Sequence, residues 1–516
     1  MNLTPEELVQ CLKQHTRLGH AKRNAAFVRQ VRLACSSPTT SLAQAASKSS
    51  NSPMADLMSL YRFINNDQAP LAALRSIRAQ AVLEGVAVGA PLAIIHDVTQ
   101  LDYTRHNCKQ DRRDIGNGGG KGYEYVPCVA VDPENGSLLG VLHDTVISAD
   151  GPDDPDQVDY HDDPLFSHFS QSERKRLREN HRHQMAVHIQ ALKPLLGNRQ
   201  AIHLGDREFD DIFILDRCRQ TGCDFVIRSS GHRNVQVPDL PWIPQSARTR
   251  KQAGHRLDPG WIYASLAGLI AAVALQPYKS LPLDSRNRVV DARNSTRIAH
   301  LSIGTFPVRL YRFAMRNKQY LKPPRIVEVN VVVIREVNPP AGLEPLCWVL
   351  LTSLPIDDFA QQVWVGHLYE LRWRIEDFFK LLKCGYAVES SRLENAEKTA
   401  KLLLLLSLAA MVVTNMKTHL GLRMQGRLSD ADYRRVKTAI QQLDNPNLDL
   451  ELRLFALILK FGGWLRRRND PIGPTVLMRG LLQLLATFNV VEEHSRLLKE
   501  AQLHPEILRK LFAYKC

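Results

Sequence analysis

The sequence has few cysteines and lacks the motifs that would mark several common protein classes. Its 516 residues include nine cysteines, scattered along the chain and with no C-x-x-C pair. An odd number of scattered cysteines argues against a disulfide scaffold and favours a reduced, intracellular protein. No P-loop occurs, so we expect no nucleotide hydrolase of that class. Met1–Arg32 is polar and basic, which is not the pattern of a secretory signal.

Long hydrophobic runs are also missing. The longest ones, Leu402–Val413 and Leu266–Leu275, fall short of the roughly 20 apolar residues that span a bilayer, so we expect no membrane partner. Hydrophobic residues make up 44% of the chain and charged residues 23%, values that exclude wholesale disorder. Acidic residues are the minority charge, 53 against 67 Lys and Arg. The formal net charge of +14 favours a polyanionic partner.

The pattern of expected elements changes several times along the chain. The first 40 residues have helical patterns and carry the cations Lys13, Arg17, Lys22, Arg23, Arg29 and Arg32. A solvated amphipathic region without a ligand is the alternative interpretation. We expect a helical domain at 1–80, the first part of an α/β core at 81–229, a β-rich insertion at 230–350, completion of the core at 351–395 and a helical C-terminal domain at 396–516.

Two short apolar strands are each expected to end at an aspartate. Leu92–His96 precedes Asp97, and Ala201–Gly205 precedes Asp206. Side chains at the ends of such strands emerge into a cleft in open α/β sheets. Between them, Asn135-Gly136 predicts a β-hairpin. The two aspartates are therefore candidates for one shared site.

A third acid lies in an amphipathic segment. At 3.6 residues per turn, one arc of about 60° holds Tyr369, Arg372, Glu376 and Lys383. The apolar face holds Leu368, Leu371, Ile375, Phe378 and Leu382. Carboxylates suit Mg²⁺, and two such ions can activate a hydroxyl and stabilise a leaving oxygen in phosphoryl transfer. A surface helix with an Arg372–Glu376 ion pair has the same periodicity, so spacing leaves both interpretations open.

These motifs resemble those of the DDE transposases of bacterial insertion sequences, specifically the insertion sequence four family. The Y-x2-R-x3-E-x6-K signature of that family is matched at every position by Tyr369, Arg372, Glu376 and Lys383. Ile95–Thr99 and Asp206–Asp210 resemble the segments around the first two catalytic acids of the family. Trp348 matches a tryptophan that stacks on a base flipped from the transposon end, and Arg228 matches an arginine beyond the second acid.

The resemblance implies a ribonuclease-H-like catalytic core with a β-rich insertion, flanked by helical N- and C-terminal domains. It implies that Asp97, Asp206 and Glu376 are catalytic and bind two Mg²⁺ ions, with Mn²⁺ as a substitute. The DNA-binding residues that it implies are Tyr369, Arg372 and Lys383 at phosphates near the cleaved end, Trp348 at the flipped base, and Arg228 at the non-transferred strand. The implied reaction is cleavage at the element's ends, through a hairpin in relatives, followed by strand transfer into target DNA.

The resemblance also implies partners and a location. Double-stranded DNA would be bound as terminal inverted repeats, by the helical domain at 1–80, and as target DNA. Two protomers would form a homodimeric synaptic complex through the C-terminal helices. The protein would lie in the bacterial cytoplasm, associated with the nucleoid when bound to DNA. A structure-selective nuclease without strand transfer and a non-enzymatic, transposase-derived DNA-binding repressor are the alternatives.

Four further features have simpler interpretations. His181, His183 and His188 are expected on a basic helical surface, because no cysteine or carboxylate falls at metal-site spacing nearby. The acidic stretch 150–163 lacks calcium-loop spacing and predicts a solvated loop. Arg466–Arg468, beside Trp464, fit an exposed helix end or a DNA contact. Trp373 is expected to be a structural residue that borders the candidate site.

Overall fold

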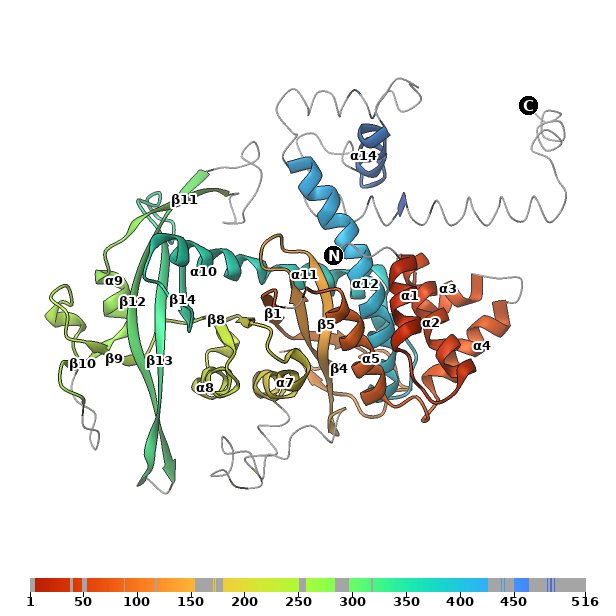
Figure 1. The fold of residues 1–516 in the computed structure, drawn as a ribbon, viewed down its shortest axis with the longest axis horizontal. Coiled ribbons are helices and arrows are strands. Elements are labelled where there is room, and N and C mark those ends of the chain that lie inside the picture. Colours follow the sequence, from red (N-terminus) through yellow and green to blue (C-terminus); the bar gives the residue numbers. More distant parts are fainter. Residues whose placement is uncertain are drawn as a thin grey trace. The chain divides into compact units, whose positions relative to one another are not determined.

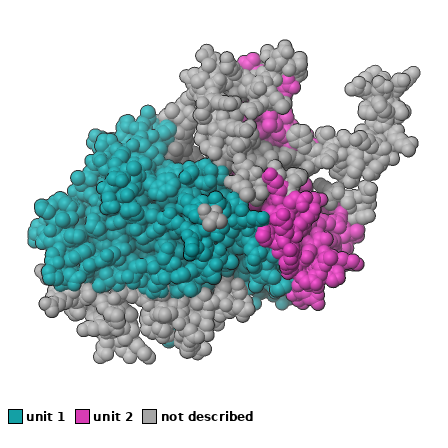
Figure 2. Space-filling model, in the orientation of Figure 1, with its two compact units in different colours: residues 1, 69–379, 392–404 teal, residues 2–68, 380–391, 405–516 magenta. Residues whose placement is uncertain are grey.

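The computed structural model describes residues 5–37, 40–48, 53–87, 89–116, 118–153, 180–249, 257–283, 297–316, 319–425 and 450–463, with 170, 172, 438, 440, 480, 483, 484 and 487. The chain divides into two compact units, which Figure 2 colours separately. The first contains Met1, Ala69–Phe379 and Arg392–Leu404, and the second contains Asn2–Gln68, Lys380–Ser391 and Leu405–Cys516. No disulfide joins the cysteines in the described ranges.

The first unit is a mixed α/β structure built on one large sheet (Figure 1). The strand order is β10-β9-β12-β13-β14-β8-β7-β1-β4-β5-β6, with β11 on β12 and with β2 and β3 on β4. The bounds are β1 Leu92–His96, β2 Thr99–Asp102, β3 Arg113–Ile115, β4 Gly120–Val131, β5 Leu138–Ser148, β6 Gly151–Pro152, β7 Ala201–Gly205, β8 Asp224–Arg228, β9 Asn234–Pro238, β10 Trp261–Ser265, β11 Gln276–Leu283, β12 Arg297–Arg316, β13 Gln319–Glu336 and β14 Cys347–Thr352.

The two predicted strands that end at aspartates are confirmed as β1 and β7, and they are neighbours. They run parallel, with Ile95 opposite Leu204, so the residues that follow them leave the sheet at the same edge. Strand β8 continues the parallel set beside β7, whereas β4 pairs antiparallel with β1. Every residue of β1 and β7 is buried, which explains why both read as continuous apolar runs rather than alternating ones.

The predicted hairpin is confirmed between β4 and β5. Gly136 has φ +68°, a left-handed conformation that glycine adopts at little cost, and its amide donates to the carbonyl of Asp132 at 2.8 Å. A second, longer hairpin is formed by β12 and β13 (Figure 1). It lies within the expected β-rich stretch 230–350, and its strands continue the same sheet.

Helices of the first unit pack on this sheet. Their bounds are α5 Leu71–Glu84, α7 His181–Leu196, α8 Ile212–Thr221, α9 Leu266–Ala272 and α10 Phe359–Leu371, with α11 Arg374–Lys380 and α12 Ala396–Gln425 continuing into the second unit, and the 3₁₀ turns η1 Arg207–Phe209 and η2 Gln245–Ala247. α8 begins at Ile212, because the Asp211 side chain accepts from the amide of Phe213 and caps the helix there. Gly222, at φ +70°, ends it.

The second unit is helical in its described residues, as predicted for the N-terminal region. Its helices are α1 Pro5–His15, α2 Ala21–Ser36, α3 Leu42–Lys48, α4 Pro53–Ile64 and α14 Leu450–Phe461, with the π-helical turn η4 Leu381–Gly385 and the 3₁₀ turn η5 Val388–Ser390. Phe27 on α2 packs on Phe63 of α4, with ring centroids 5.9 Å apart. Among the described residues, no helix is both long and apolar enough to cross a membrane.

A buried ionic network fastens α5 to the sheet. Arg75 Nε lies 2.8 Å from Asp144 Oδ1, and Arg78 Nη1 lies 2.7 Å from Asp144 Oδ2. All three side chains are buried. Burial alone would raise the pKa of Asp144, but Arg78 and Arg75 outweigh it and hold that pKa well below its usual range. The carboxylate is therefore charged in the folded protein, and it pairs with two buried guanidinium groups.

We expect Asp144→Ala to destabilise the first unit by about 3–5 kcal/mol, because both arginines would be left buried without this partner. Because the pKa of Asp144 is depressed on folding, the contribution is present above the unfolded pKa of about 4 and is lost as the pH falls below it. Urea unfolding followed by circular dichroism at pH 7 measures the change. Asp114→Ala, which removes an exposed partner of Lys121, is the control and should cost under about 1 kcal/mol. Equal losses in the two variants would contradict this role.

Candidate active site

Two aspartates stand at one edge of the sheet. Asp97 follows β1, and its Oδ1 accepts from the amide of Val98 at 2.8 Å. Asp206 follows β7, and its Oδ1 accepts from the amide of Glu208 at 2.7 Å, which caps η1. Each carboxylate is thus oriented by the backbone that immediately follows it. The parallel pairing of β1 and β7 brings the two positions to the same end of the sheet.

Arg372 joins the first aspartate to the third acid. Its Nη1 lies 3.1 Å from Asp97 Oδ2, and its Nη2 lies 3.2 Å from Glu376 Oε1. The Arg372 side chain is largely buried, whereas the Glu376 side chain is 56% exposed. One guanidinium therefore bridges a carboxylate at a strand end and a carboxylate on α11. The ion pair that periodicity alone suggested between Arg372 and Glu376 is present, and it extends to Asp97.

The pKa of Asp97 reflects its burial and the charges around it. Burial, and to a smaller extent the charges of Asp206 and Glu376, raise the pKa of Asp97 to about 6. The Val98 amide and Arg372 act in the opposite direction without cancelling the rise. The three acids are thus close enough to repel one another, and one arginine does not compensate them. Additional positive charge at this edge would stabilise the ionised form of Asp97.

The donor set fits hard divalent cations. Three carboxylates provide the oxygen ligands that Mg²⁺ prefers. The described groups whose ligand atoms lie within 4.8 Å of one another do not, however, include Asp97, Asp206 and Glu376 together. Arg372 stands between Asp97 and Glu376, in the place where a shared cation would lie. A cation held by both carboxylates therefore requires the guanidinium to move from between them.

The predicted single helical arc is wrong in one respect. α10 ends at Leu371 and α11 begins at Arg374; across the junction the amides of Ile375 and Glu376 donate to carbonyls three residues back. Such 3₁₀-type bonds advance each residue by about 120° instead of 100°. Tyr369 is consequently only 2% exposed and does not share an exposed face with Glu376. The apolar face is confirmed, with buried Leu368, Leu371, Ile375, Phe378 and Leu382.

Trp348 and Arg228 lie on neighbouring strands. The Trp348 ring on β14 packs on Tyr369, with centroids 5.9 Å apart, and is half-buried. Arg228, at the end of β8, donates from Nη2 to the carbonyl of Cys347 at 3.3 Å. Lys383 belongs to the second unit, where it lies in η4 and pairs with Glu389. The DNA contacts expected of these residues stay predictions.

Two expectations about neighbouring side chains need correction. Trp373 borders the site, since its ring centroid is 5.8 Å from the Arg372 guanidinium carbon, but its ring is 49% exposed, more than a purely structural role requires. His183 and His188 are buried rather than on a basic surface, because α7 packs with that face on β4 and β5. Only His181 is partly exposed, and it pairs with Glu124 and Glu208.

The structure describes only part of the acidic stretch 150–163 and none of the basic stretch 464–468. Asp153 is buried and pairs with Arg75 at 2.8 Å, so the expected solvated loop is wrong for this residue. Residues 154–163 lie outside the described residues, as do Trp464 and Arg466–Arg468.

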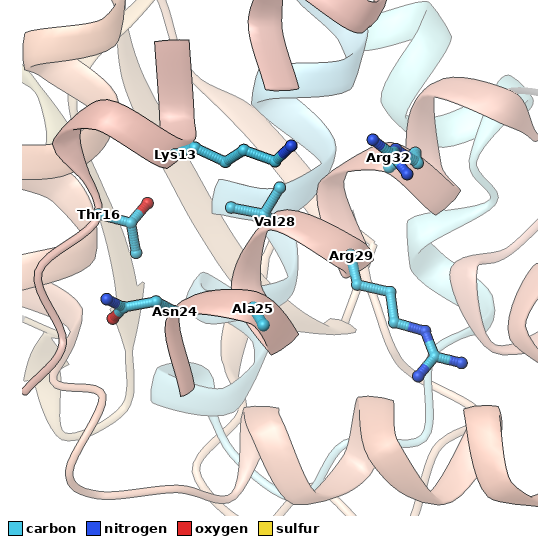
Figure 3. Close-up of a pocket in the computed structure, with 7 residues that line it drawn as sticks. All are labelled: Lys13, Thr16, Asn24, Ala25, Val28, Arg29 and Arg32. Carbon is cyan, nitrogen blue, oxygen red and sulfur yellow. The ribbon is translucent and has the colours of Figure 1, made fainter. Parts of the chain in front are cut away.

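A second basic feature lies within the N-terminal helices of the second unit. A pocket of about 360 Å³ between α1 and α2 is lined by Lys13, Thr16, Asn24, Ala25, Val28, Arg29 and Arg32 (Figure 3). Arg29 pairs with Asp56, whose side chain is buried. The sequence identified these cations, but their gathering around one pocket depends on how α1 packs on α2. The spacing of the residues does not reveal that packing.

Part of the chain matches a known protein family. Residues 168–412 match the family model described as the transposase DDE domain, a stretch that contains Asp206 and Glu376 and begins after Asp97. The match supports a DDE transposase. DDE transposases act on DNA with divalent metal ions, which agrees with the carboxylate donors at this edge of the sheet.

One solved structure is also similar over much of the chain. It is the cryo-EM structure of the piggyBac transposase synaptic complex with hairpin DNA, with 11% sequence identity and a TM-score of 0.32. The match covers 87% of this chain and 62% of that chain, so the present chain spans less than two thirds of its relative. At this TM-score the likeness carries no argument about fold or mechanism.

We expect Asp97→Asn to stabilise the folded protein at high pH. Because the folded pKa of Asp97 is raised, its protonated form contributes stability at low pH that is lost as the pH rises from about 4 to about 6. In chelator at pH 8, the substitution should raise the free energy of unfolding by roughly 2 kcal/mol, and at pH 4 it should change little. Urea unfolding at the two pH values measures this difference. The surface variant Asp114→Asn is the control, and the same gain at both pH values would refute the assignment.

Proposed function

We propose that this chain is a cut-and-paste DNA transposase of a bacterial insertion sequence, similar to the insertion sequence four family. It would cleave DNA at the element's ends and join those ends to target DNA. The observation that carries the proposal is the bridge from Asp97 through Arg372 to Glu376, beside Asp206. Two of these three acids lie within the stretch matched by the transposase DDE domain.

The sheet topology supports a ribonuclease-H-like core. Strands β5-β4-β1-β7-β8 are contiguous, with β1, β7 and β8 parallel to one another and with β4 antiparallel to β1 and β5. In that arrangement the first acid follows the first core strand, the second acid follows the neighbouring parallel strand, and the third acid comes from a helix after the inserted strands. Asp97 follows β1, Asp206 follows β7, and Glu376 lies on α11 after the inserted strands, an order that supports the proposal.

The chain's own residues would perform positioning and charge stabilisation. Asp97, Asp206 and Glu376 would hold two divalent ions, which when bound supply the Lewis acidity that activates the attacking hydroxyl and stabilises the leaving oxygen. Once displaced from between the two carboxylates, the Arg372 guanidinium can bind a phosphate with two parallel hydrogen bonds. Tyr369 and Trp348 pack together beside it, and Trp348 would stack on a base near the cleaved end. No covalent protein intermediate is required.

The basic pocket of the second unit supports recognition of terminal inverted repeats. Lys13 and Arg32 are exposed cations from different helices at one pocket, which suits contact with successive phosphates of double-stranded DNA. Pairing of two protomers through the C-terminal helices would complete a synaptic complex. Lys383 would contact phosphate near the cleaved end, and Arg228 would contact the non-transferred strand.

Glu376→Gln should reduce magnesium-dependent cleavage of DNA that carries the cognate ends by at least about 100-fold. Glutamine keeps an oxygen that can accept from Arg372, so folding should be retained while the negative charge toward the ions is lost. Cleavage of labelled ends by the purified full-length protein measures the effect. The matched control is Glu328→Gln, which alters an exposed glutamate on β13 that pairs with Arg309. This variant should cut DNA at the wild-type rate. Undiminished cutting by folded Glu376→Gln would remove the metal-binding role.

Lys13→Ala and Arg32→Ala should each weaken end binding and lower the slope of log affinity against log salt by about 1, as expected when one phosphate contact is lost. Lys22→Ala and Arg17→Ala are the matched controls, because these cations are exposed nearby but do not line the pocket. Fluorescence anisotropy across a salt series measures both quantities without magnesium. If the controls change the slope as much as the pocket variants do, the pocket is not the DNA contact.

A further inference from the structure

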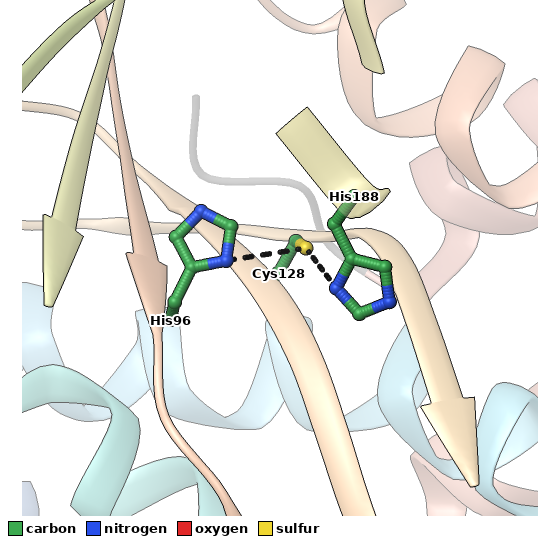
Figure 4. Close-up of side chains that lie close together, drawn as sticks. All are labelled: His96, Cys128 and His188. Carbon is green, nitrogen blue, oxygen red and sulfur yellow. Dashed lines mark hydrogen bonds between the residues drawn. The ribbon is translucent and has the colours of Figure 1, made fainter. Parts of the chain in front are cut away.

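A buried cluster of two histidines and a cysteine lies behind the acidic edge. His96 on β1, Cys128 on β4 and His188 on α7 are all fully buried, and their side chains converge (Figure 4). Cys128 Sγ lies 3.6 Å from His96 Nδ1 and 3.1 Å from His188 Nδ1. The three potential ligand atoms all lie within 4.8 Å of one another. These separations suit three ligands of one ion with metal–nitrogen and metal–sulfur bonds of about 2.1 and 2.3 Å.

The outer ring nitrogens of both histidines are held by other side chains. His96 Nε2 lies 2.8 Å from His203 Nδ1, and His188 Nε2 lies 2.8 Å from Thr145 Oγ1. Histidines that bind metals usually make such a bond from the nitrogen that does not face the metal, because it fixes the tautomer and the ring orientation. Both imidazoles therefore present the same atom, Nδ1, toward the sulfur.

In one tautomer, hydrogen bonding favours an ion at the centre. When each outer nitrogen donates to its partner, two Nδ1 lone pairs face a single thiol, which has one proton. One buried acceptor then lacks a donor, which is unfavourable. A cation satisfies both lone pairs and the sulfur at once.

We propose that His96, Cys128 and His188 form a binding site for one transition-metal ion of the Zn²⁺ class, separate from the carboxylate site. On binding, the thiol proton leaves to solvent and the thiolate and the two ring nitrogens bond to the ion, with no change in oxidation state. Mixed nitrogen and sulfur donors select zinc-like ions over Mg²⁺, which requires oxygen ligands. The two sites would therefore not compete for the same metal.

The position of the cluster gives the ion a structural role. His96 immediately precedes Asp97, and His203, which holds the outer nitrogen of His96, lies on β7, which leads to Asp206. An ion bound here would tie β1 to β4 and α7 directly behind the two aspartates. It would fix the strands whose ends carry the acids and would take no part in the chemistry itself.

Cobalt substitution of the full-length protein tests the site. The chain is unfolded in chelator, refolded with Co²⁺, and freed of unbound metal; it should retain about one ion per chain and show a thiolate-to-cobalt charge-transfer band in the near ultraviolet. Cys128→Ser should lose the band, whereas the control Cys218→Ser, which alters a buried thiol on α8, should keep it. Thr145→Val, which removes only the outer partner of His188, should weaken Zn²⁺ affinity by about 10–100-fold.

Two outcomes of the cobalt experiment would contradict the proposed metal site. If folded wild-type protein shows no charge-transfer band and retains no Co²⁺ or Zn²⁺, the cluster is a neutral hydrogen-bonded network and the proposal is wrong. An equally strong band in Cys128→Ser would place the bound metal elsewhere. The wild-type spectrum suffices for this decision even if a variant does not fold. Because the readout is metal content and not DNA cleavage, the result stands whatever becomes of the proposed transposase activity.

Discussion

The burial of one carboxylate, Asp97, beside two other acids at one edge of the sheet is the constraint on which the candidate site depends. The parallel register of β1 and β7 delivers Asp97 and Asp206 to that edge, and α11 adds Glu376. The burial of Asp97 and, to a smaller extent, the charges of the other two acids raise its pKa, and Arg372 compensates only in part. Such an arrangement lowers the stability of the folded protein and is typical of functional sites. Binding of hard cations beside a phosphate would be a function of this kind.

The interior behind this edge is unusually polar, and its polar groups connect the elements that position the acids. Arg75 and Arg78 fasten α5 to β5 through Asp144. In the antiparallel pairing of β4 with β5, Asp144 lies opposite Pro127. Next to Pro127 on β4, Cys128 meets histidines from β1 and α7. Each contact is directional, unlike apolar packing, so it restricts how far one strand can slide against the next. These contacts therefore help to hold the strands that carry Asp97 and Asp206 in register.

Sequence patterns predicted the local features of the site and missed what depends on packing between distant elements. The apolar strands before Asp97 and Asp206, and the hairpin at Gly136, follow from short-range propensities and were predicted in place. A helical wheel does not predict the burial of Tyr369, because it assumes one regular α-helix, whereas the chain forms 3₁₀-type hydrogen bonds after Arg372. His188 was assigned to a surface for a similar reason: its partners, His96 and Cys128, lie on strands far away in the sequence, and only the fold brings them to α7.

In the proposed transposase, Arg372 would link cation binding to phosphate binding. While it bridges Asp97 and Glu376, its two terminal nitrogens are engaged and a phosphate would have to compete with two carboxylates. If those carboxylates held a divalent ion, the ion would supply the charge that Arg372 otherwise supplies, and the guanidinium would be available to an incoming phosphodiester. Each ligand would then lower the free energy of binding the other, and by thermodynamic linkage the effect would be reciprocal. DNA and metal ions would thus favour the same rearranged site, whereas the arginine bridge stabilises the acids in their absence.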